Sequence, residues 1–180
     1  AILFFSKKTK DSKIMTKYGL DSKNYILATI HRQENTDDSS KLKSIFSALS
    51  KSHLPVIIPL HPRTKSMLDK YKIVITKNIK IVDPASYLEI ISLEKNAHKI
   101  ITDSGGIQKE AFYSNVPCIT LREETEWVEL VNLGFNTLVG TEKQKIIKAI
   151  NADVQIIQSK IYGDGSTSSK IVKHILEFSS

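Results

Sequence analysis

The sequence contains a single cysteine, Cys118, among its 180 residues. One thiol cannot form an intramolecular disulfide, which excludes the paired-cysteine frameworks of small secreted domains. We therefore expect a reduced, cytoplasmic setting, and we predict that Cys118, within the strand-like segment PCITL, is a small core residue. The histidines and acidic residues lack metal-ligand spacing, so no metal is expected.

Long apolar runs are also absent. No run approaches the ~20 residues that a transmembrane helix needs, so we expect no membrane partner. The N-terminal segment AILFFSKKTK is too short and wrongly flanked for a secretory signal peptide. The chain begins with Ala1 instead of Met, and we expect it to be a fragment of a longer protein. Its length suggests one domain with an adequate core.

The net charge of +7 is not concentrated in one stretch. The lysines recur at helical spacing along several segments, which is typical of solvated helix faces. Zinc-finger spacing and RNP-like aromatic motifs are absent from the sequence, so we expect no nucleic-acid partner. A basic nucleic-acid-binding module is the alternative from a different class of protein, and it predicts steeply salt-dependent binding to DNA or RNA.

What the sequence does contain is a regular alternation of two kinds of segment. Short apolar runs occupy residues 25–30, 56–60, 79–82, 99–102, 118–121 and 137–139. Segments with helical periodicity lie at residues 38–52, 86–96, 141–150 and 166–178. This alternation predicts βαβ units and a mostly parallel α/β sheet with right-handed crossovers. The less periodic residues 1–24 are predicted to lead in from a preceding domain, and residues 25–180 to form the folded domain.

Polar clusters follow five of the predicted strands, namely HRQEN, HPR, DP, DSGG and REETE. In a parallel sheet these clusters share one edge, where open α/β sheets bind ligands. The DSGG cluster, residues 103–106, opens a helix, and its backbone N–H groups together with the helix dipole favour an anion such as phosphate. Its glycines allow the backbone to approach a ligand closely. A capped turn without a ligand is the alternative, because DSGG is neither GxGxxG nor a Walker A sequence.

Side chains around these clusters add candidate roles. Ser104 could cap the helix or hydrogen-bond the ligand. Glu110 could accept hydrogen bonds from ribose hydroxyls, or it could be a surface residue paired with Lys109. His31 suits proton transfer because it titrates near neutral pH, and Arg32 suits a bidentate phosphate clamp.

Other residues are predicted to be structural. Trp127 is expected to pack in the core rather than stack on a ligand, and Thr125 is expected to cap the helix that follows it. His53, His98 and His174 are expected to be structural or exposed to solvent.

Six strings together resemble the non-hydrolysing UDP-N-acetylglucosamine 2-epimerases: ATIHRQENTDD, PLHPRT, DPASYLEI, TDSGGIQKEA, PCITLREETEWVELVNLGFNTLVG and YGDGSTSSKIV. The likeness runs from about residue 25 to residue 172 and keeps the motifs in the family's order. It covers only the C-terminal half of such an enzyme. That family has GT-B architecture, with two Rossmann-like domains and an active site in the cleft between them. The resemblance therefore implies a Rossmann-like three-layer α/β/α fold for this chain.

The resemblance also implies a reaction. The family inverts C2 of UDP-GlcNAc to give UDP-ManNAc, by eliminating UDP and then adding it back. UDP-GlcNAc and UDP-ManNAc are therefore the implied ligands, and no metal or redox cofactor is required. A homodimer is implied for the full-length enzyme, which in this family usually supplies bacterial surface polysaccharides.

Site residues follow from the same motifs. The residues implied to contact the substrate are Ile90 at the uracil, Ser104, Gly105 and Gly106 at the diphosphate, Glu110 at the ribose, Arg122 near the phosphates, and His31 as the catalytic histidine. Arg32 and His61 match positions where some members bind a second, regulatory UDP-GlcNAc. The carboxylates that act on the sugar belong to the other half of the enzyme.

The sequence departs from the family pattern at three positions. Gln33 stands where many relatives have a second Arg, and Lys109 stands where many have an acid. Ile90 replaces an aromatic residue found in some members. These departures affect regulation and uracil packing. A hydrolysing relative that releases free sugar and a GT-B glycosyltransferase domain are the remaining alternatives.

Overall fold

The computed structural model describes residues 2–5, 13–154, 161–163 and 165–178. Its centre is a six-stranded sheet in the order β3-β2-β1-β4-β5-β6, and every neighbouring pair of strands is parallel. The strands are β1 (Ile26–Thr29), β2 (Val56–Pro59), β3 (Ile79–Val82), β4 (Lys99–Thr102), β5 (Cys118–Thr120) and β6 (Asn136–Leu138). This order is that of a Rossmann sheet, which confirms the predicted fold class.

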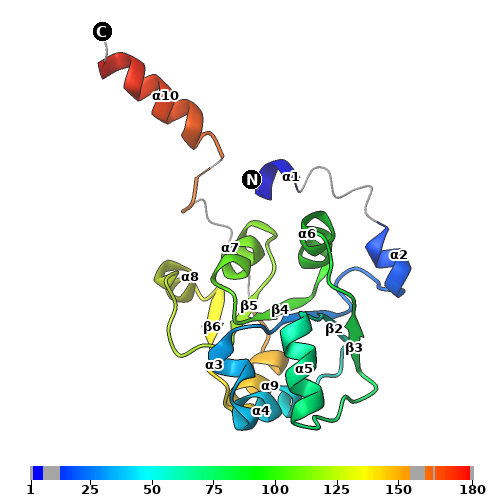
Figure 1. The fold of residues 1–180 in the computed structure, drawn as a ribbon. Coiled ribbons are helices and arrows are strands. Elements are labelled where there is room, and N and C mark those ends of the chain that lie inside the picture. Colours follow the sequence, from blue (N-terminus) through cyan, green and yellow to red (C-terminus); the bar gives the residue numbers. More distant parts are fainter. Residues whose placement is uncertain (1, 6–12, 155–160, 164, 179–180) are drawn as a thin grey trace.

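Helices cover both faces of the sheet, which gives three layers (Figure 1). The helices are α1 (Ile2–Phe5), α2 (Ile14–Tyr18), α3 (Gln33–Thr36), α4 (Ser39–Leu49), α5 (Pro62–Lys70), α6 (Tyr87–Asn96), α7 (Gly105–Tyr113), α8 (Val128–Asn132), α9 (Lys143–Asn151) and α10 (Thr167–Phe178). Apolar side chains of α4, α5 and α9 pack on one face of the sheet. Those of α2, α6, α7 and α8 pack on the other face.

Strands β1, β4 and β5 are buried on both faces, as expected for a parallel sheet between helices, whereas Lys80 and Ile81 of β3 are exposed. In β1, Ile26 and Ala28 point into the core beneath α4 and α9, whereas Leu27 points into the core beneath α6 and α7. This alternation follows from the two-residue period of a strand. Cys118 is buried in the second of these cores, which confirms its predicted place.

Local signals fix where two of the predicted helices begin. The side chain of Asp38 accepts hydrogen bonds from the backbone N–H groups of Ser40 and Lys41 at the start of α4. Ser86 and Glu89 form a capping box at the start of α6. The helical segments predicted at residues 38–52 and 86–96 are therefore confirmed, with ends that differ by a few residues.

The N-terminal residues contact the folded domain. Ile14 of α2 is 2% exposed and belongs to the core beneath α6 and α7. The ring of Phe5 in α1 meets the ring of Tyr87 edge-on, with 5.6 Å between centroids. These contacts join α1 and α2 to α6, and the assignment of residues 1–24 to a lead-in from a preceding domain stays a prediction.

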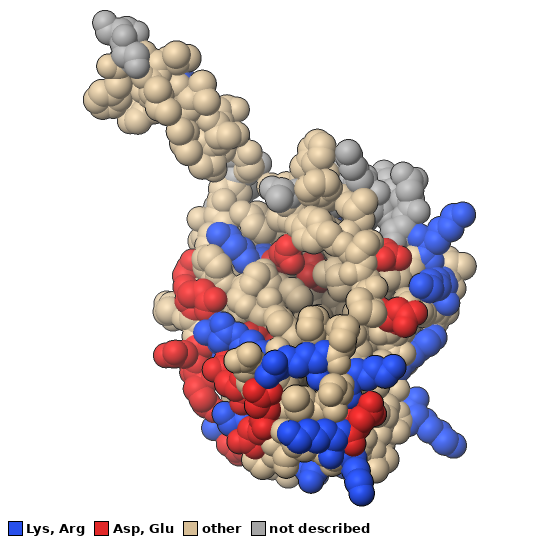
Figure 2. All heavy atoms as spheres, in the orientation of Figure 1, with Lys and Arg blue, Asp and Glu red and all other residues tan. Residues whose placement is uncertain are grey.

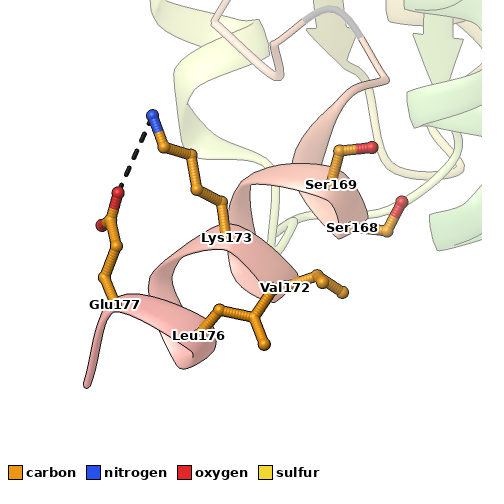
Figure 3. A pocket seen from close by; sticks show the side chains of 6 residues that line it. All are labelled: Ser168, Ser169, Val172, Lys173, Leu176 and Glu177. Atoms are coloured by element: carbon orange, nitrogen blue, oxygen red, sulfur yellow. Dashed lines mark ion pairs between the residues drawn. The ribbon is translucent and has the colours of Figure 1, made fainter. Parts of the chain in front are cut away.

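The last helix, α10, extends away from the sheet (Figure 1). A hollow of about 680 Å³ lies beside it, and the residues that line this hollow all belong to α10: Ser168, Ser169, Val172, Lys173, Leu176 and Glu177 (Figure 3). A hollow walled by a single helix offers one side only, so it does not enclose a ligand. Within the described part of the chain, no helix combines the length and the apolar character that a bilayer crossing requires.

Charges of both signs lie side by side on the surface. On the face drawn in Figure 2, acidic side chains border the basic ones. This agrees with the interpretation of the lysines as solvated, and the absence of a nucleic-acid partner stays a prediction.

Candidate functional site

The loops after β1 and β4 are joined by a buried carboxylate, that of Asp103. This side chain is 0% exposed and accepts hydrogen bonds from the backbone N–H groups of His31 and Arg32 and from the amide Nδ2 of Asn35. Asn35 Nδ2 also donates to the carbonyl of Leu121 after β5, at 3.2 Å. Three strand ends are thus held together at the carboxyl edge of the sheet, where a parallel α/β sheet binds its ligands.

His31 is oriented by the same carboxylate. Its Nδ1 lies 3.2 Å from Asp103 Oδ1, and nearly half of its side chain is exposed. A proton on Nδ1 satisfies the carboxylate, and this leaves Nε2 as the second ring nitrogen available for a ligand or a proton. The hydrogen bond to Asp103 raises the pKa of His31, although partial burial opposes the shift. The Asp103 carboxylate therefore favours the imidazolium form of His31 more than water does.

Sequence reasoning did not assign Asp103 a role, although it lies inside the DSGG cluster. Thr29 and Thr102, the last residues of the neighbouring strands β1 and β4, are paired in register. His31 and Asp103 therefore lie just beyond two adjacent strand ends. A strand-end His and a strand-end Asp were both visible in the sequence. The strand order that makes them neighbours was not, because it depends on pairing between distant segments.

The N-terminus of α7 lies at this edge. Ser104 is its N-cap, with Oγ 3.5 Å from the N–H of Ile107, which confirms the capping role. The first N–H groups of a helix have no acceptor within the helix, and they point outward from its N-terminus. Gly106 is exposed, and a Cβ added there would meet only Ser104 Oγ, at 3.8 Å. The space in front of Gly106 is therefore open.

A carboxylate already lies against this helix N-terminus. A Cβ added at Gly105 would overlap Oε1 of Glu126, so the Glu126 carboxylate rests directly on the Gly105 backbone. Arg122 Nη1 pairs with Glu126 Oε2 at 2.7 Å. The pKa of Glu126 lies below its ordinary value, first because of its own backbone N–H and then because of the Arg122 guanidinium, with burial acting against them. A carboxylate and a guanidinium thus lie together beside the first residue of α7.

A buried polar network fixes the loop that carries Arg122 and Glu126. Gln108 Oε1 accepts hydrogen bonds from Thr125 Oγ1 at 2.6 Å and from Asn136 Nδ2 at 2.8 Å. Trp127 Nε1 donates to the carbonyl of Gly105 at 2.7 Å. The prediction that Thr125 caps α8 is wrong, because Trp127 is the N-cap of that helix. The Thr125 hydroxyl donates to Gln108 and accepts from the N–H of Trp127, ahead of the first helical residue. Trp127 packs against the core, as predicted.

Glu110 and Ile90 lie on two adjacent helices, α7 and α6. Glu110 is half-buried and accepts a hydrogen bond from Tyr87 Oη at 3.1 Å. The alternative pairing of Glu110 with Lys109 is not what the structure shows, because the Lys109 ammonium lies 4.4 Å from the ring centroid of Trp127. Ile90 is partly exposed on α6. The residues expected at the ribose and at the uracil thus come from neighbouring helices.

The two residues expected at a regulatory site precede helices α3 and α5 at this edge of the sheet. Arg32 lines a hollow of about 240 Å³ together with Lys41, Arg122 and acidic residues that include Glu34. His61 is not among the described residues that line this hollow. Its Nδ1 caps α5 by accepting from the N–H of Arg63, at 3.2 Å. This capping contact gives His61 a structural role at the same edge of the sheet.

Comparison with known proteins identifies the family of this sequence. Residues 2–176 match the sequence model of the family described as UDP-N-acetylglucosamine 2-epimerase. The chain belongs to that family. A Methanococcus maripaludis protein named UDP-N-acetylglucosamine 2-epimerase homolog is 47% identical over 170 residues, which cover 91% of this chain and 48% of that protein. This chain therefore spans about half the length of such relatives.

Two further relatives bear on the ligand of this epimerase family member. A Pseudomonas aeruginosa protein named UDP-2,3-diacetamido-2,3-dideoxy-D-glucuronate 2-epimerase is 40% identical, over 96% of this chain and 49% of that protein. The solved structure of Methanocaldococcus jannaschii UDP-GlcNAc 2-epimerase, in complex with UDP-GlcNAc and UDP, matches with a TM-score of 0.85 and 36% identity. That match covers 98% of this chain and 52% of the M. jannaschii chain.

Proposed function

We propose that this chain is the UDP-binding half of an epimerase that interconverts UDP-GlcNAc and UDP-ManNAc. The observation that carries the proposal is the accessible N-terminus of α7, where open space faces Gly106 and a guanidinium and a carboxylate meet at Gly105. A helix N-terminus of this kind suits a diphosphate. Membership of the epimerase family supplies the nucleotide and the reaction class.

In this proposal the nucleotide lies along α7 and α6. The diphosphate takes the N–H groups at Gly105 and Gly106 with the Ser104 hydroxyl, and Arg122 exchanges the Glu126 carboxylate for a phosphate oxygen. The ribose hydroxyls donate to Glu110. The uracil packs beside Ile90. The solved complex of the M. jannaschii epimerase with UDP-GlcNAc and UDP supports a ligand of this kind.

The chemistry requires UDP to leave and return without escaping. Loss of the C2 proton and of UDP from C1 gives a glycal-type intermediate, and addition of UDP and a proton with opposite stereochemistry at C2 gives the epimer. His31, in the imidazolium form that Asp103 favours, and Arg122 stabilise the negative charge that develops on the departing diphosphate. Because UDP stays bound beside the intermediate, its return is effectively unimolecular. The groups that move the C2 proton are assigned to the other half of the enzyme.

A second candidate differs only in the sugar. The 40% identity to the P. aeruginosa relative favours a diacetamido glucuronate attached to the same UDP. The residues described above would contact the nucleotide in both cases. An assay of the two-domain protein with both nucleotide sugars decides between them. Release of free sugar would instead indicate the hydrolysing alternative, and transfer to an acceptor would indicate the glycosyltransferase alternative.

We further propose that the full-length enzyme is a cytoplasmic homodimer that supplies polysaccharide synthesis, with Arg32 and His61 as candidates for a regulatory site.

The test is a titration of UDP into this chain by calorimetry. We expect weak saturable binding that is lost in Gly106→Asp, because a carboxylate there occupies the open space and repels the diphosphate. The matched control is Ser66→Asp, which adds the same charge at an exposed position of α5. Equal binding by Gly106→Asp and the wild type would contradict the proposed site. Turnover by this chain alone would contradict its assignment as half of an active site.

A further inference from the structure

Glu94 of α6 carries a fully buried carboxyl group. It is 0% exposed, and within the described residues no Lys, Arg or His forms an ion pair with it. Neither carboxylate oxygen has a hydrogen-bond donor among the described groups. A buried, ionised carboxylate without a donor or a cation is strongly unfavourable. This side chain therefore needs either a proton or a partner.

The group that faces Glu94 is Glu110, the residue proposed to bind the ribose. Glu110 is the charged group that acts on the Glu94 carboxyl, across the packed helices α6 and α7. Two ionised carboxylates can only accept hydrogen bonds, so a bond between them exists only when one of them carries a proton. Burial, and then the negative charge of Glu110, raise the pKa of Glu94 to about 9. Glu94 is fully buried, whereas Glu110 is half-buried and accepts a hydrogen bond from Tyr87, so Glu94 is the member of the pair that keeps the proton.

The other titratable groups around the pair do not supply a cation. Tyr87 of α6 donates to Glu110, and burial, followed by the charge of Glu110, raises its pKa to about 12. Cys118 of β5 lies close enough for the charge of Glu94 to act on it, and burial raises the pKa of its thiol to about 12. Both groups are neutral at pH 7. Glu110 thus faces two neutral groups able to donate, Tyr87 and protonated Glu94.

We propose that Glu94 is a positioning residue, whose protonated carboxyl donates a hydrogen bond to Glu110 and holds it as the acceptor for the ribose hydroxyls. The inference rests on the proposed function, in which Glu110 binds the ribose. With one oxygen fixed by Tyr87 and a second bond from Glu94, the Glu110 carboxylate keeps one orientation. Its remaining lone pairs then already point toward the ligand, so little conformational entropy is lost when the ribose binds. The carboxylate is thus preorganised for binding.

Two substitutions of similar length separate the hydrogen bond from mere packing. Glu94→Gln keeps a donor toward Glu110, whereas Glu94→Met fills the same space without one. Affinity for UDP, 2′-deoxy-UDP and 3′-deoxy-UDP is measured by NMR titration of the full chain and of both variants. The wild type and Glu94→Gln are expected to prefer UDP over at least one deoxy analogue by about ten-fold, the usual worth of a hydrogen bond to a charged group. Glu94→Met is expected to lose most of that preference.

The outcomes are distinct. An unchanged preference for UDP in Glu94→Met, or loss of the preference in Glu94→Gln, would overturn the positioning role and leave the proposed function in place. Absence of UDP binding by the wild type would overturn the proposed function.

A separate measurement needs no ligand, because the 13C shift of the Glu94 carboxyl carbon shows directly whether that carboxyl group is protonated. We expect that carbon to show a neutral carboxyl at pH 7, and an ionised one would overturn the inference.

Discussion

The carboxylate of Glu126 occupies the place that the diphosphate is proposed to take, so its removal should strengthen UDP binding. It rests on Gly105 at the N-terminus of α7 and pairs with Arg122 at 2.7 Å. A negative charge at a helix N-terminus contributes about 0.3–1 kcal/mol. A partly exposed ion pair contributes up to about 1 kcal/mol. The diphosphate must replace both interactions before it binds.

Substitution Glu126→Gln keeps the shape of the side chain and removes its charge. In the wild type, UDP must displace a carboxylate whose interactions contribute about 1 kcal/mol. Without that competition, we expect UDP to bind about five-fold more tightly. The gain should shrink at high ionic strength because both charges are partly exposed to solvent. The assay is an NMR titration of UDP at low and at high salt.

The matched control for this prediction is Glu124→Gln. Glu124 lies in the same loop and is exposed, and its substitution changes the net charge by the same amount. A five-fold gain in Glu126→Gln beyond any gain in Glu124→Gln supports displacement of the carboxylate. Equal affinities in the two variants, or weaker binding by Glu126→Gln, would refute the reasoning and would indicate that Glu126 contacts the ligand.

Two further predictions concern stability. Because the pKa of folded His31 is raised, its pairing with Asp103 stabilises the fold below the unfolded value of 6.5, and this contribution is lost as pH rises through the folded value. Urea unfolding at about pH 5.5 and about pH 8.5 should therefore show a smaller difference in His31→Gln than in the wild type, and equal differences would contradict the pairing. The buried Lys99 donates to the carbonyls of Ala149, Ile150 and Ala152 at the end of α9. Lys99→Met should lower the free energy of unfolding by about 2 kcal/mol, since those carbonyls lose their donor, and an unchanged unfolding midpoint would count against this role.

Local patterns were enough to predict the sheet. The six apolar runs all became strands, because a parallel sheet between helices buries most of their residues and leaves a strong signal in the sequence. Helices α3 and α5 were not predicted. The first has only four residues, and the second begins with His61-Pro62, which reads equally well as a turn.

The candidate site was only partly visible in the sequence. The capping role of Ser104 could be predicted, because a cap depends on residues three positions apart. The contacts of Asp103 with His31 and of Glu126 with Gly105 could not, since both depend on which strand ends become neighbours. The buried Glu94 was likewise hidden, because its position within a helix gave no sign that it faces Glu110.

The central claim is that the N-terminus of α7 binds the diphosphate of UDP. The most direct measurement follows the backbone amide resonances of the 15N-labelled chain during a titration with UDP. We predict that the amides of Gly105, Gly106 and Ile107 shift most, with saturation, and that these shifts vanish in Gly106→Asp. Saturable shifts confined to other residues, with these three amides unmoved at millimolar UDP, would contradict the account.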